Sequence, residues 1–397
     1  MQKIRLVIFN ETYWNKGLIY SQNIQPLFKL SKEIGAEFEV ISFTSLLLFF
    51  RKRKQIIKAK KELLKEGISV KNKFVLVYPH RFFFPNRVMI PYLYLNVFLY
   101  ISSLSWRDRG KNVFLFLRSY QTALFFNKFY KEKNNLIFDT RTDWLEENVN
   151  LGRIKRYSIT YNYWHKNLKA IVDTFRKTLC ISEVCKNNMC KCLGVSETQI
   201  DVIYNPIDYD HFNFPKVKHQ SVNFLYTGSI GNWNKLENYL DIFKIYNKHN
   251  SDSKFFICTA TVPSVVNSVL NRQEYDGVRN SIEVYYNVSY DDLPTYYSIC
   301  DFGFQLMRIP DSRVGVKFVE YVAAGVTPII NNNVQGAVYL ANKYKIGVVL
   351  PDNASEGEII TLIEKGKDKI DRSNSEYQAF KELTDIHSIV KRYASYL

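Results

Sequence analysis

The chain has 397 residues, of which 46% are hydrophobic and 23% charged, and a formal net charge of +16. This length exceeds one ordinary domain and suits two domains of roughly 180 to 200 residues, each large enough for its own hydrophobic core. The composition, without long low-complexity stretches, excludes a largely disordered protein.

The N-terminal residues alternate between strand and helix patterns. KIRLVIF (residues 3–9) predicts an apolar strand, residues 19–35 predict a helix that ends at Gly35, and EFEVIS (37–42) predicts a second strand. Strand, helix and strand at this spacing favour a doubly wound parallel sheet. The N-terminus lacks the apolar core of a signal peptide, so we expect a cytoplasmic protein.

The positive charge is concentrated in the first half of the chain. Residues 1–210 hold 34 Lys and Arg against 18 Asp and Glu, whereas residues 211–397 hold 20 of each kind. Residues 51–73 alone hold ten basic residues and two Glu. Such a run is usually the solvated face of a helix, but it also suits an anionic membrane surface, where each basic residue contributes about 1 kcal/mol.

Two apolar runs flank this basic segment and would supply apolar contacts for membrane docking: SLLLFF (45–50) and the uncharged residues 88–106. The second run reaches transmembrane length, but Pro91 and Asn96 weigh against a span. A buried domain helix and a surface-docking helix both remain open for it. A nucleic-acid partner is not expected, because residues 51–73 contain no aromatic side chain on which a base would stack.

The segment NLIFDTRTDWLEENVN (135–150) predicts a strand that ends at Asp139, followed by a polar loop with Arg141 and Asp143. Ligands of open α/β sheets bind outside the carboxyl ends of the strands, so these three side chains are candidate site residues. In the alternative reading, the two Glu residues that follow only stabilise the first turn of the next helix.

The six cysteines predict reduced thiols and no metal site. Cys185, Cys190 and Cys192 lie on a predicted helix and lack paired C-x-x-C spacing, which disfavours zinc. The sequence also has no H-E-x-x-H, Walker or G-x-G-x-x-G motif.

A polar segment with one Pro (213–221) predicts a linker between domains at 1–212 and 222–374.

The segment RIPDSRVGVKFVEYVAAGVTPII (308–330) predicts a short helix between two strands, preceded by Gly315 and ended by a left-handed Gly325. Lys317 and Glu320 are three residues apart on this helix and are therefore neighbours. The helix N-terminus and Lys317 would favour an anion, and Glu320 would accept hydrogen bonds from sugar hydroxyls. Alternatively, the two form a solvated pair worth a few tenths of a kcal/mol, about 0.2 to 0.5.

In this order and spacing, the segments resemble glycosyltransferase family 4, retaining enzymes of the GT-B fold. The run from Lys317 through Glu320 to Pro328 is similar to the family signature K-x-x-E-Y-x-A-x-G-x-P-x-I, with one extra residue before the Pro. The resemblance covers nearly the whole chain. Residues 222–246 look like the first strand, the loop and the helix of the family's second domain, where Gly228 lets the backbone approach a ligand. Residues 281–308 resemble a strand, a loop, a helix and a further strand of the same domain. It implies two Rossmann-like α/β domains that face each other across a cleft, with a C-terminal helix (375–397) that crosses back to the first domain.

The chain departs from the family pattern at two places. Ser312 stands where the family often has a Glu, with Asp311 one register off, which leaves the identity of the donor sugar open. Ser229 stands where the family often has an Arg, and Lys235 lies one residue beyond the usual Lys. Two further arginines are candidates to replace the lost charge, namely Arg308 and Arg313.

The resemblance also implies roles for the candidate residues. Lys317 and Lys235 would hold the donor diphosphate, Glu320 the ribose, and backbone near Tyr285 and Val288 the nucleobase. The other predicted donor-site residues are Gly228, Ser229, Ser312 and Val316. Asp139, Arg141 and Asp143 would line the acceptor side.

The predicted function is therefore transfer of a sugar from a nucleotide-sugar donor to an acceptor hydroxyl, with retention and without a metal or other cofactor. The basic first domain predicts a saccharide or lipid-linked saccharide acceptor in cell-surface polysaccharide assembly, and a cytoplasmic location or a peripheral one on the inner face of the cell membrane. A catalytically inactive scaffold, which would explain Ser312, and a sugar-nucleotide epimerase are the alternatives.

Overall fold

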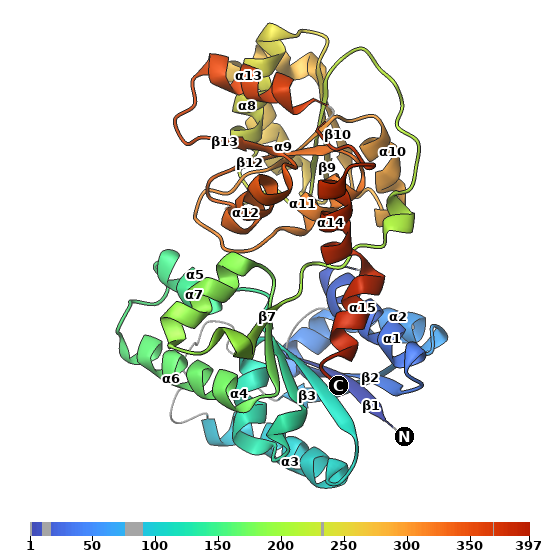
Figure 1. The fold of residues 1–397 in the computed structure, drawn as a ribbon, viewed down its shortest axis with the longest axis vertical. Coiled ribbons are helices and arrows are strands. Elements are labelled where there is room, and N and C mark those ends of the chain that lie inside the picture. Colours follow the sequence, from blue (N-terminus) through green and yellow to red (C-terminus); the bar gives the residue numbers. More distant parts are fainter. Residues whose placement is uncertain (1, 10–16, 76–89, 232–233, 368) are drawn as a thin grey trace. The chain divides into compact units, whose positions relative to one another are not determined.

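The computed structural model describes residues 2–9, 17–75, 90–231, 234–367 and 369–397. The chain forms two compact units, Met1–Pro206 with Ile386–Leu397, and Ile207–Asp385 (Figure 1). Within these described ranges, each unit is built on one sheet whose strands are all parallel, seven in the first unit and six in the second. The predicted fold class, two doubly wound α/β domains, is confirmed.

The sheet of the first unit has the strand order β3-β2-β1-β4-β5-β6-β7. Its strands are β1 Lys3–Phe9, β2 Glu37–Ser45, β3 Ser69–Val75, β4 Val113–Arg118, β5 Leu136–Asp139, β6 Lys177–Cys180 and β7 Ile200–Val202. The helices are α1 Gln25–Glu33, α2 Leu46–Lys65, α3 Ile90–Asp108, α4 Tyr120–Phe129, α5 Trp144–Asn150, α6 Ile159–Thr174, α7 Glu183–Leu193 and α15 Ile386–Ala394. Every residue of β4 and β5 is buried, as expected for strands covered by helices on both faces.

The sheet of the second unit has the order β10-β9-β8-β11-β12-β13. Its strands are β8 Asn223–Thr227, β9 Lys254–Thr259, β10 Ile282–Tyr286, β11 Phe302–Gln305, β12 Thr327–Asn331 and β13 Val348–Leu350. The helices are α8 Leu236–His249, α9 Pro263–Leu270, α10 Leu293–Ser298, α11 Val316–Ala323, α12 Gln335–Tyr344, α13 Glu356–Gly366 and α14 Ser375–Thr384. Short 3-10 turns lie at Lys133–Asn135, Glu197–Gln199, Tyr209–Phe212, Gln273–Ser281 and Tyr290–Asp292.

The predicted helix at 19–35 begins as a π-helix, Tyr20–Ile24, and continues as α1, after which Gly35 has a φ of 65°. Pro26 directly follows the π turn within one continuous helical backbone, so its missing N–H leaves a carbonyl of the preceding turn without a helical donor. The wider π turn places two polar side chains, Gln22 and Asn23, in the interior.

The prediction of one continuous helix at the C-terminus is wrong, because the segment forms α14 and α15 with a break between them. Asp385 has an extended backbone (ψ 133°) and forms a parallel bridge with Ile207, whose N–H donates to the Thr384 carbonyl at 2.8 Å. The helix α15 then belongs to the first unit, where it packs beside α1 (Figure 1).

The basic segment 51–73 is divided between α2 and β3, and Gly67 lies between them with a φ of 88°. The uncharged run largely forms α3, although residues 88 and 89 lie outside the described part of the chain. Among the described residues, no helix is both long enough and apolar enough to cross a membrane. In α3, Val97, Ile101 and Leu104 are buried.

A buried cluster of charges joins β1, β2 and the end of α3. Arg5 donates hydrogen bonds to Glu39 and to Asp108, and all three side chains are buried. Tyr130 also donates to Asp108, at 3.1 Å, and Lys71 lies 2.6 Å from Glu39. Burial alone would raise the pKa of Glu39, but the hydrogen bonds from Lys71 and Arg5 lower that pKa to about 2.

Replacing Arg5 by Leu should destabilise the first unit by about 3 to 5 kcal/mol, because two carboxylates would stay buried without their shared partner. Arg272→Leu is the matched control, since Arg272 is 45% exposed and pairs with Glu237 at the surface. This control should cost less than about 1 kcal/mol. Urea unfolding checks both variants, and equal small losses would show that Arg5 is not needed to neutralise the cluster.

Candidate functional site

The candidate site in the second unit lies where the direction of strand addition reverses. From β8 the chain adds β9 and β10 on one side, and it then returns to add β11, β12 and β13 on the other. Since β8 and β11 are neighbours, the loops after them leave the sheet at the same edge. Ligands of open α/β sheets bind at such a reversal, outside the carboxyl ends of the strands.

The loop after β8 begins with Gly228, whose φ of 141° is unfavourable for residues with a side chain. Its N–H donates to the Cys258 carbonyl at 2.9 Å, and a Cβ here would lie 3.3 Å from the Tyr226 hydroxyl. Tyr226 donates in turn to the carbonyl of Ser229 at 2.7 Å. The two predicted residues therefore form a fixed turn at the end of β8.

The N-terminus of α11 lies close to the end of β11. The Gln305 side-chain oxygen accepts a hydrogen bond from the Phe318 N–H at 2.8 Å. A Cβ on Gly315 would lie 2.1 Å from the Gln305 amide nitrogen, so only Gly permits this approach. We expected the amides of this helix end to be free for an anion, but the protein itself already occupies the amide of Phe318.

Lys317 and Glu320 are in direct contact, as their spacing predicts. The Lys317 ammonium donates to Glu320 Oε2 at 2.8 Å, and the buried Tyr297 hydroxyl donates to the same oxygen at 3.1 Å. Burial and the nearby Glu320 carboxylate raise the pKa of Tyr297 well above its usual value, so it stays a donor. Glu320 is only 4% exposed, which rules out the alternative of a solvated surface pair.

Tyr321, the next residue on α11, ties this helix to two strands. Its hydroxyl accepts the Thr227 N–H at 3.1 Å and lies 3.4 Å from the Phe304 carbonyl as a donor. Tyr297 and Tyr321 were not predicted as site residues. Nothing in the sequence around Tyr297 indicates its contact with Glu320, which joins residues 23 positions apart.

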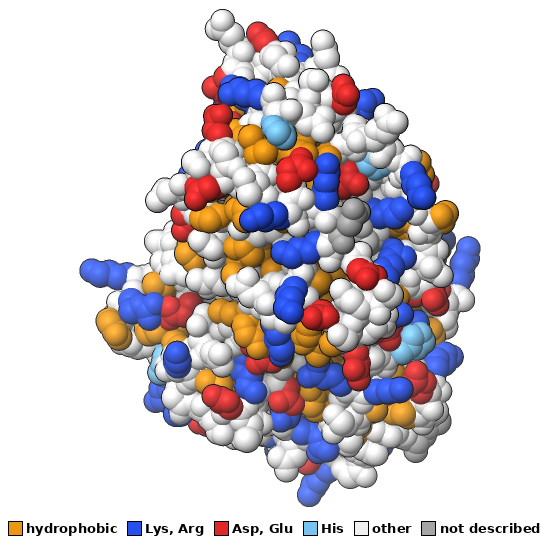
Figure 2. Space-filling view, turned by 45° about the horizontal axis from the view of Figure 1, so that its top comes forward, with side chains coloured by type: hydrophobic (Ala, Val, Ile, Leu, Met, Phe, Trp, Pro, Cys, Tyr) orange, Lys and Arg blue, Asp and Glu red, His pale blue; other side chains and the backbone are white. Residues whose placement is uncertain are grey.

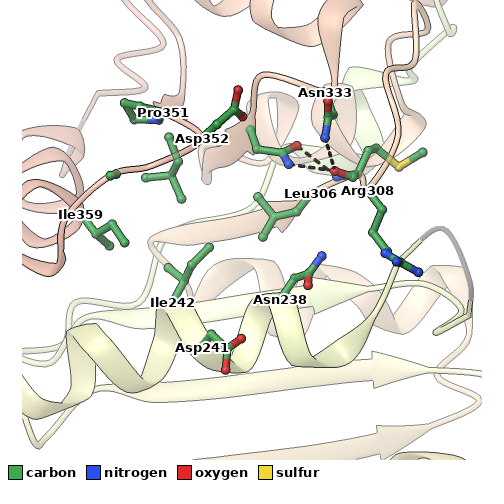
Figure 3. A pocket seen from close by; sticks show the side chains of 13 residues that line it. Asn238, Asp241, Ile242, Leu306, Arg308, Asn333, Pro351, Asp352 and Ile359 are labelled. Carbon is green, nitrogen blue, oxygen red and sulfur yellow. Dashed lines mark hydrogen bonds between the residues drawn. The ribbon is translucent and has the colours of Figure 1, made fainter.

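The loop between β11 and α11 holds three further predicted residues. Arg313 forms a two-pronged ion pair with Asp311, with Nε to Oδ1 at 2.8 Å and Nη2 to Oδ2 at 2.6 Å. Ser312 between them is 9% exposed. Arg308 is exposed and lines a cavity of ≈590 Å³ (Figure 3), and neither Lys317 nor Glu320 contributes to the lining of that cavity.

The remaining predicted residues of this unit lie at ends of strands and helices. Lys235 is the residue before α8 and Val316 is the first residue of α11, and both are half-buried. Tyr285 lies in β10 and donates to Glu283 at 2.5 Å. Val288 follows β10, next to Asn287, which has a φ of 56°.

In the first unit, Asp139 and Arg141 pair with each other at the carboxyl end of β5. Arg141 Nε lies 2.8 Å from Asp139 Oδ2, which also accepts from Asn23 at 2.6 Å. Arg118 donates to Gln22 at 3.0 Å and to Asn23, so the π-helix is tied to the ends of two strands. The sequence did not indicate this network, because its members lie up to 119 positions apart.

Arg141 also donates to the Tyr393 hydroxyl of α15 at 3.3 Å. Its Nη1 atom is buried and has no hydrogen-bond partner in the described part of the chain. Nη1 carries two N–H groups, so this guanidinium has two donors without a partner among the described residues.

Asp143 differs from this network, because its carboxyl is buried and forms no ion pair with any residue that the structure describes. The residue is 7% exposed and precedes α5, and its Oδ2 finds no hydrogen-bond donor among the described residues. Burial raises the pKa of Asp143 to about 7, and the neighbouring Glu146 carboxylate adds to the rise. Glu146 itself pairs with Arg156 and Glu147 accepts from Thr142, so the two Glu residues do more than stabilise the helix turn.

No group of three or more His, Cys, Asp or Glu side chains suited to a metal ion occurs in the described ranges. The six cysteines are free thiols, and burial raises the pKa of Cys192 to about 11.

Residues 210–381 match the family model of glycosyl transferases group 1. This match covers the second unit, including Lys317 and Glu320, and supports glycosyl transfer as the general activity. No curated protein matches the chain in sequence.

The chain as a whole is similar in fold to solved glycosyltransferases of the GT-B type. A glycosyltransferase from Rickettsia africae is 14% identical with a TM-score of 0.68, over 99% of this chain and 97% of that one. HepE from Anabaena, in complex with UDP-glucose, is 12% identical with a TM-score of 0.66, over 100% and 99%. A TarM variant from S. aureus, in complex with fondaparinux, α-GlcNAc-glycerol and UDP, is 9% identical with a TM-score of 0.65, over 100% and 99%.

The stability of the protein should depend on the protonation of Asp143. Because folding raises the pKa of this carboxyl from 3.8 to about 7, its neutral form stabilises the fold fully below about pH 4, and this contribution is lost as the pH rises to about 7. The free energy of unfolding, relative to Asp143→Asn, should fall by up to roughly 4 kcal/mol over that range. Urea titrations of both proteins at several pH values measure it, and parallel curves would contradict the raised pKa.

Proposed function

We propose that this protein transfers a sugar, with retention of anomeric configuration, from a nucleoside diphosphate sugar to an acceptor hydroxyl. The observation that carries the proposal is the Lys317–Glu320–Tyr297 arrangement at the strand-order reversal of the second unit, within the segment that matches glycosyl transferases group 1. A uridine nucleotide is the donor we favour, since HepE and TarM are complexed with UDP or UDP-glucose.

The leaving diphosphate needs its developing charge stabilised, and the second unit offers cations at the correct edge of the sheet. Lys317 is 31% exposed and can reach a ligand while it stays near Glu320, and Lys235 stands at the start of α8. Arg313 is held by Asp311, and Arg308 lines the cavity instead, so we assign neither to the diphosphate. Positioned charges in a site of low dielectric are the largest single contribution to many enzymatic rates.

Glu320 would hold the ribose. Its Oε2 atom already accepts two hydrogen bonds, from Lys317 and Tyr297, which fix the carboxylate in orientation. The other oxygen of Glu320 is therefore already oriented to accept a hydrogen bond from a ribose hydroxyl. The departing phosphate could take the acceptor proton, so the scheme requires no protein nucleophile and no metal.

The acceptor would bind the first unit near the carboxyl end of β5. Asp143 and Arg141 each have a buried polar atom without a partner among the described residues, and both lie in the loop that follows Asp139. Unused donors and acceptors of this kind are suited to the hydroxyls of a saccharide.

The acceptor we propose is linked to a lipid, and the helix α2 would bring the protein to the membrane. Most basic residues of α2 are exposed, and Leu47 and Phe50 near its start are 78% and 69% exposed. Figure 2 shows acidic and basic side chains interspersed over the face of the molecule that it draws. The helix α3 does not belong to this surface: buried residues of α2 share one core cluster with those of α1 and α15, whereas α3 packs against α4.

Lys317→Ala should weaken UDP binding about 10- to 100-fold, because hydrogen bonds to charged groups contribute about 1.5 to 3 kcal/mol. Isothermal titration calorimetry with UDP measures this change. Lys254→Ala is the control, since Lys254 also pairs with a Glu but begins β9, at the opposite edge of the sheet. Unchanged affinity in Lys317→Ala would place the nucleotide elsewhere.

Two further outcomes separate the rival functions. If wild-type protein binds no nucleotide, the scaffold is favoured. If it converts a nucleotide sugar without any acceptor, it is an epimerase.

Replacing Arg51, Arg53, Lys54, Lys58 and Lys61 by Gln should abolish most binding to phosphatidylglycerol vesicles, at about 1 kcal/mol for each charge. Five exposed cations elsewhere in the first unit provide the matched control: Lys131, Arg153, Lys155, Lys166 and Lys191. Vesicle sedimentation measures both variants. Equal losses would mean that net charge alone, rather than α2, drives the association.

A further inference from the structure

A cavity of ≈590 Å³ opens in the second unit between α8 and the ends of β11, β12 and β13. Figure 3 shows Asn238, Asp241 and Ile242 on α8, with Arg308 towards one end and Pro351 and Asp352 towards the other. Its volume falls within the range of about 300 to 1,000 Å³ that is usual for small-ligand sites. The residues that surround it differ from those assigned above to the nucleotide.

Several polar side chains of this cavity have capacity to bind a ligand. The described part of the chain offers no hydrogen-bond partner to the side chains of Arg308, Asn238 and Asp352. Asp241 is oriented by the Tyr275 hydroxyl, which donates to its Oδ1 at 2.9 Å. The side-chain nitrogen of Asn333 donates to the Met307 carbonyl at 3.0 Å. The side-chain oxygen of Asn333 is then left to accept a hydrogen bond from a ligand.

The chemistry of the lining disfavours a phosphate and favours hydroxyl groups. Two carboxylates, Asp241 and Asp352, and one guanidinium, that of Arg308, line the cavity, so the lining carries a net negative charge that repels an anion. A hydroxyl both donates and accepts, and a lining of amides, carboxylates and a guanidinium can satisfy both of its roles. Ile242 and Leu306 provide apolar surface for the C–H face of a sugar ring.

We propose that this cavity binds a neutral saccharide of one or two rings, as a second subsite in the unit that holds the nucleotide. Its expected role, to retain a part of the glycan that is not reacting, rests on the proposed function. The binding itself does not rest on it, because the cavity shares no residue with the Lys317 and Glu320 pair.

The test uses the full chain with three neutral disaccharides, maltose, lactose and N,N′-diacetylchitobiose, in saturation-transfer NMR titrations. We expect saturable binding of at least one, with a Kd of about 1 mM, or about −4 kcal/mol. The double variant Asn238→Ala with Asp352→Ala should weaken this binding about tenfold or more, because it removes two ligand hydrogen bonds. Both residues lie at least partly exposed, so the variant should fold.

Lys317→Ala and saturating UDP are the controls, and neither should change disaccharide binding. The proposal is overturned if none of the three binds, if the double variant binds as wild type does, or if UDP displaces the disaccharide. UDP binding is measured on the same samples. A protein that binds UDP but no disaccharide refutes the cavity alone, whereas one that binds a disaccharide but no UDP refutes the proposed donor site alone.

Discussion

Glu320 is a carboxylate buried on α11, and one of its oxygens accepts hydrogen bonds from both Lys317 and Tyr297. A buried charge is tolerated only with such partners, so the three side chains fix one another. Tyr321, one position on, ties the same helix to β8 and β11. The turn at Gly228 and the start of α11 are thereby held at one edge of the sheet, where a ligand would meet groups that are already oriented.

The first unit has a comparable buried ion pair, in which the acidic residue comes before the basic residue in the sequence. Asp139 ends β5 and pairs with Arg141, and Asn23 of the π-helix donates a hydrogen bond to the same Asp139 carboxylate. This network leaves Asp143 as a carboxyl without an ion-pair partner in the described chain, and burial raises its pKa to about 7. Perturbed groups of this kind cluster at functional sites, because a pKa near neutrality lets one side chain both donate and accept a proton.

The sequence was sufficient for the elements and the parallel sheets, because strand, loop and helix signals repeat at regular spacing and short-range pairs such as Lys317 and Glu320 follow from helix geometry. It was insufficient wherever distant segments meet. Tyr297 reaches Glu320 across 23 positions, and Gln22 reaches Arg141 across 119. The break at Asp385 was also missed, because its cause is a bridge to Ile207 rather than a local helix-breaking residue. Arg308 and Arg313 could be proposed from charge alone, but only the structure shows that Arg313 pairs with Asp311 and that Arg308 lines a cavity.

A crystal structure of the full chain with UDP tests the central claim most directly. We predict diphosphate oxygens within hydrogen-bonding distance of the Lys317 ammonium and of the backbone that follows Gly228, with the ribose hydroxyls on the free oxygen of Glu320. UDP bound at any other place, with the Lys317 and Glu320 pair undisturbed, would contradict the assignment of this edge of the sheet as the donor site.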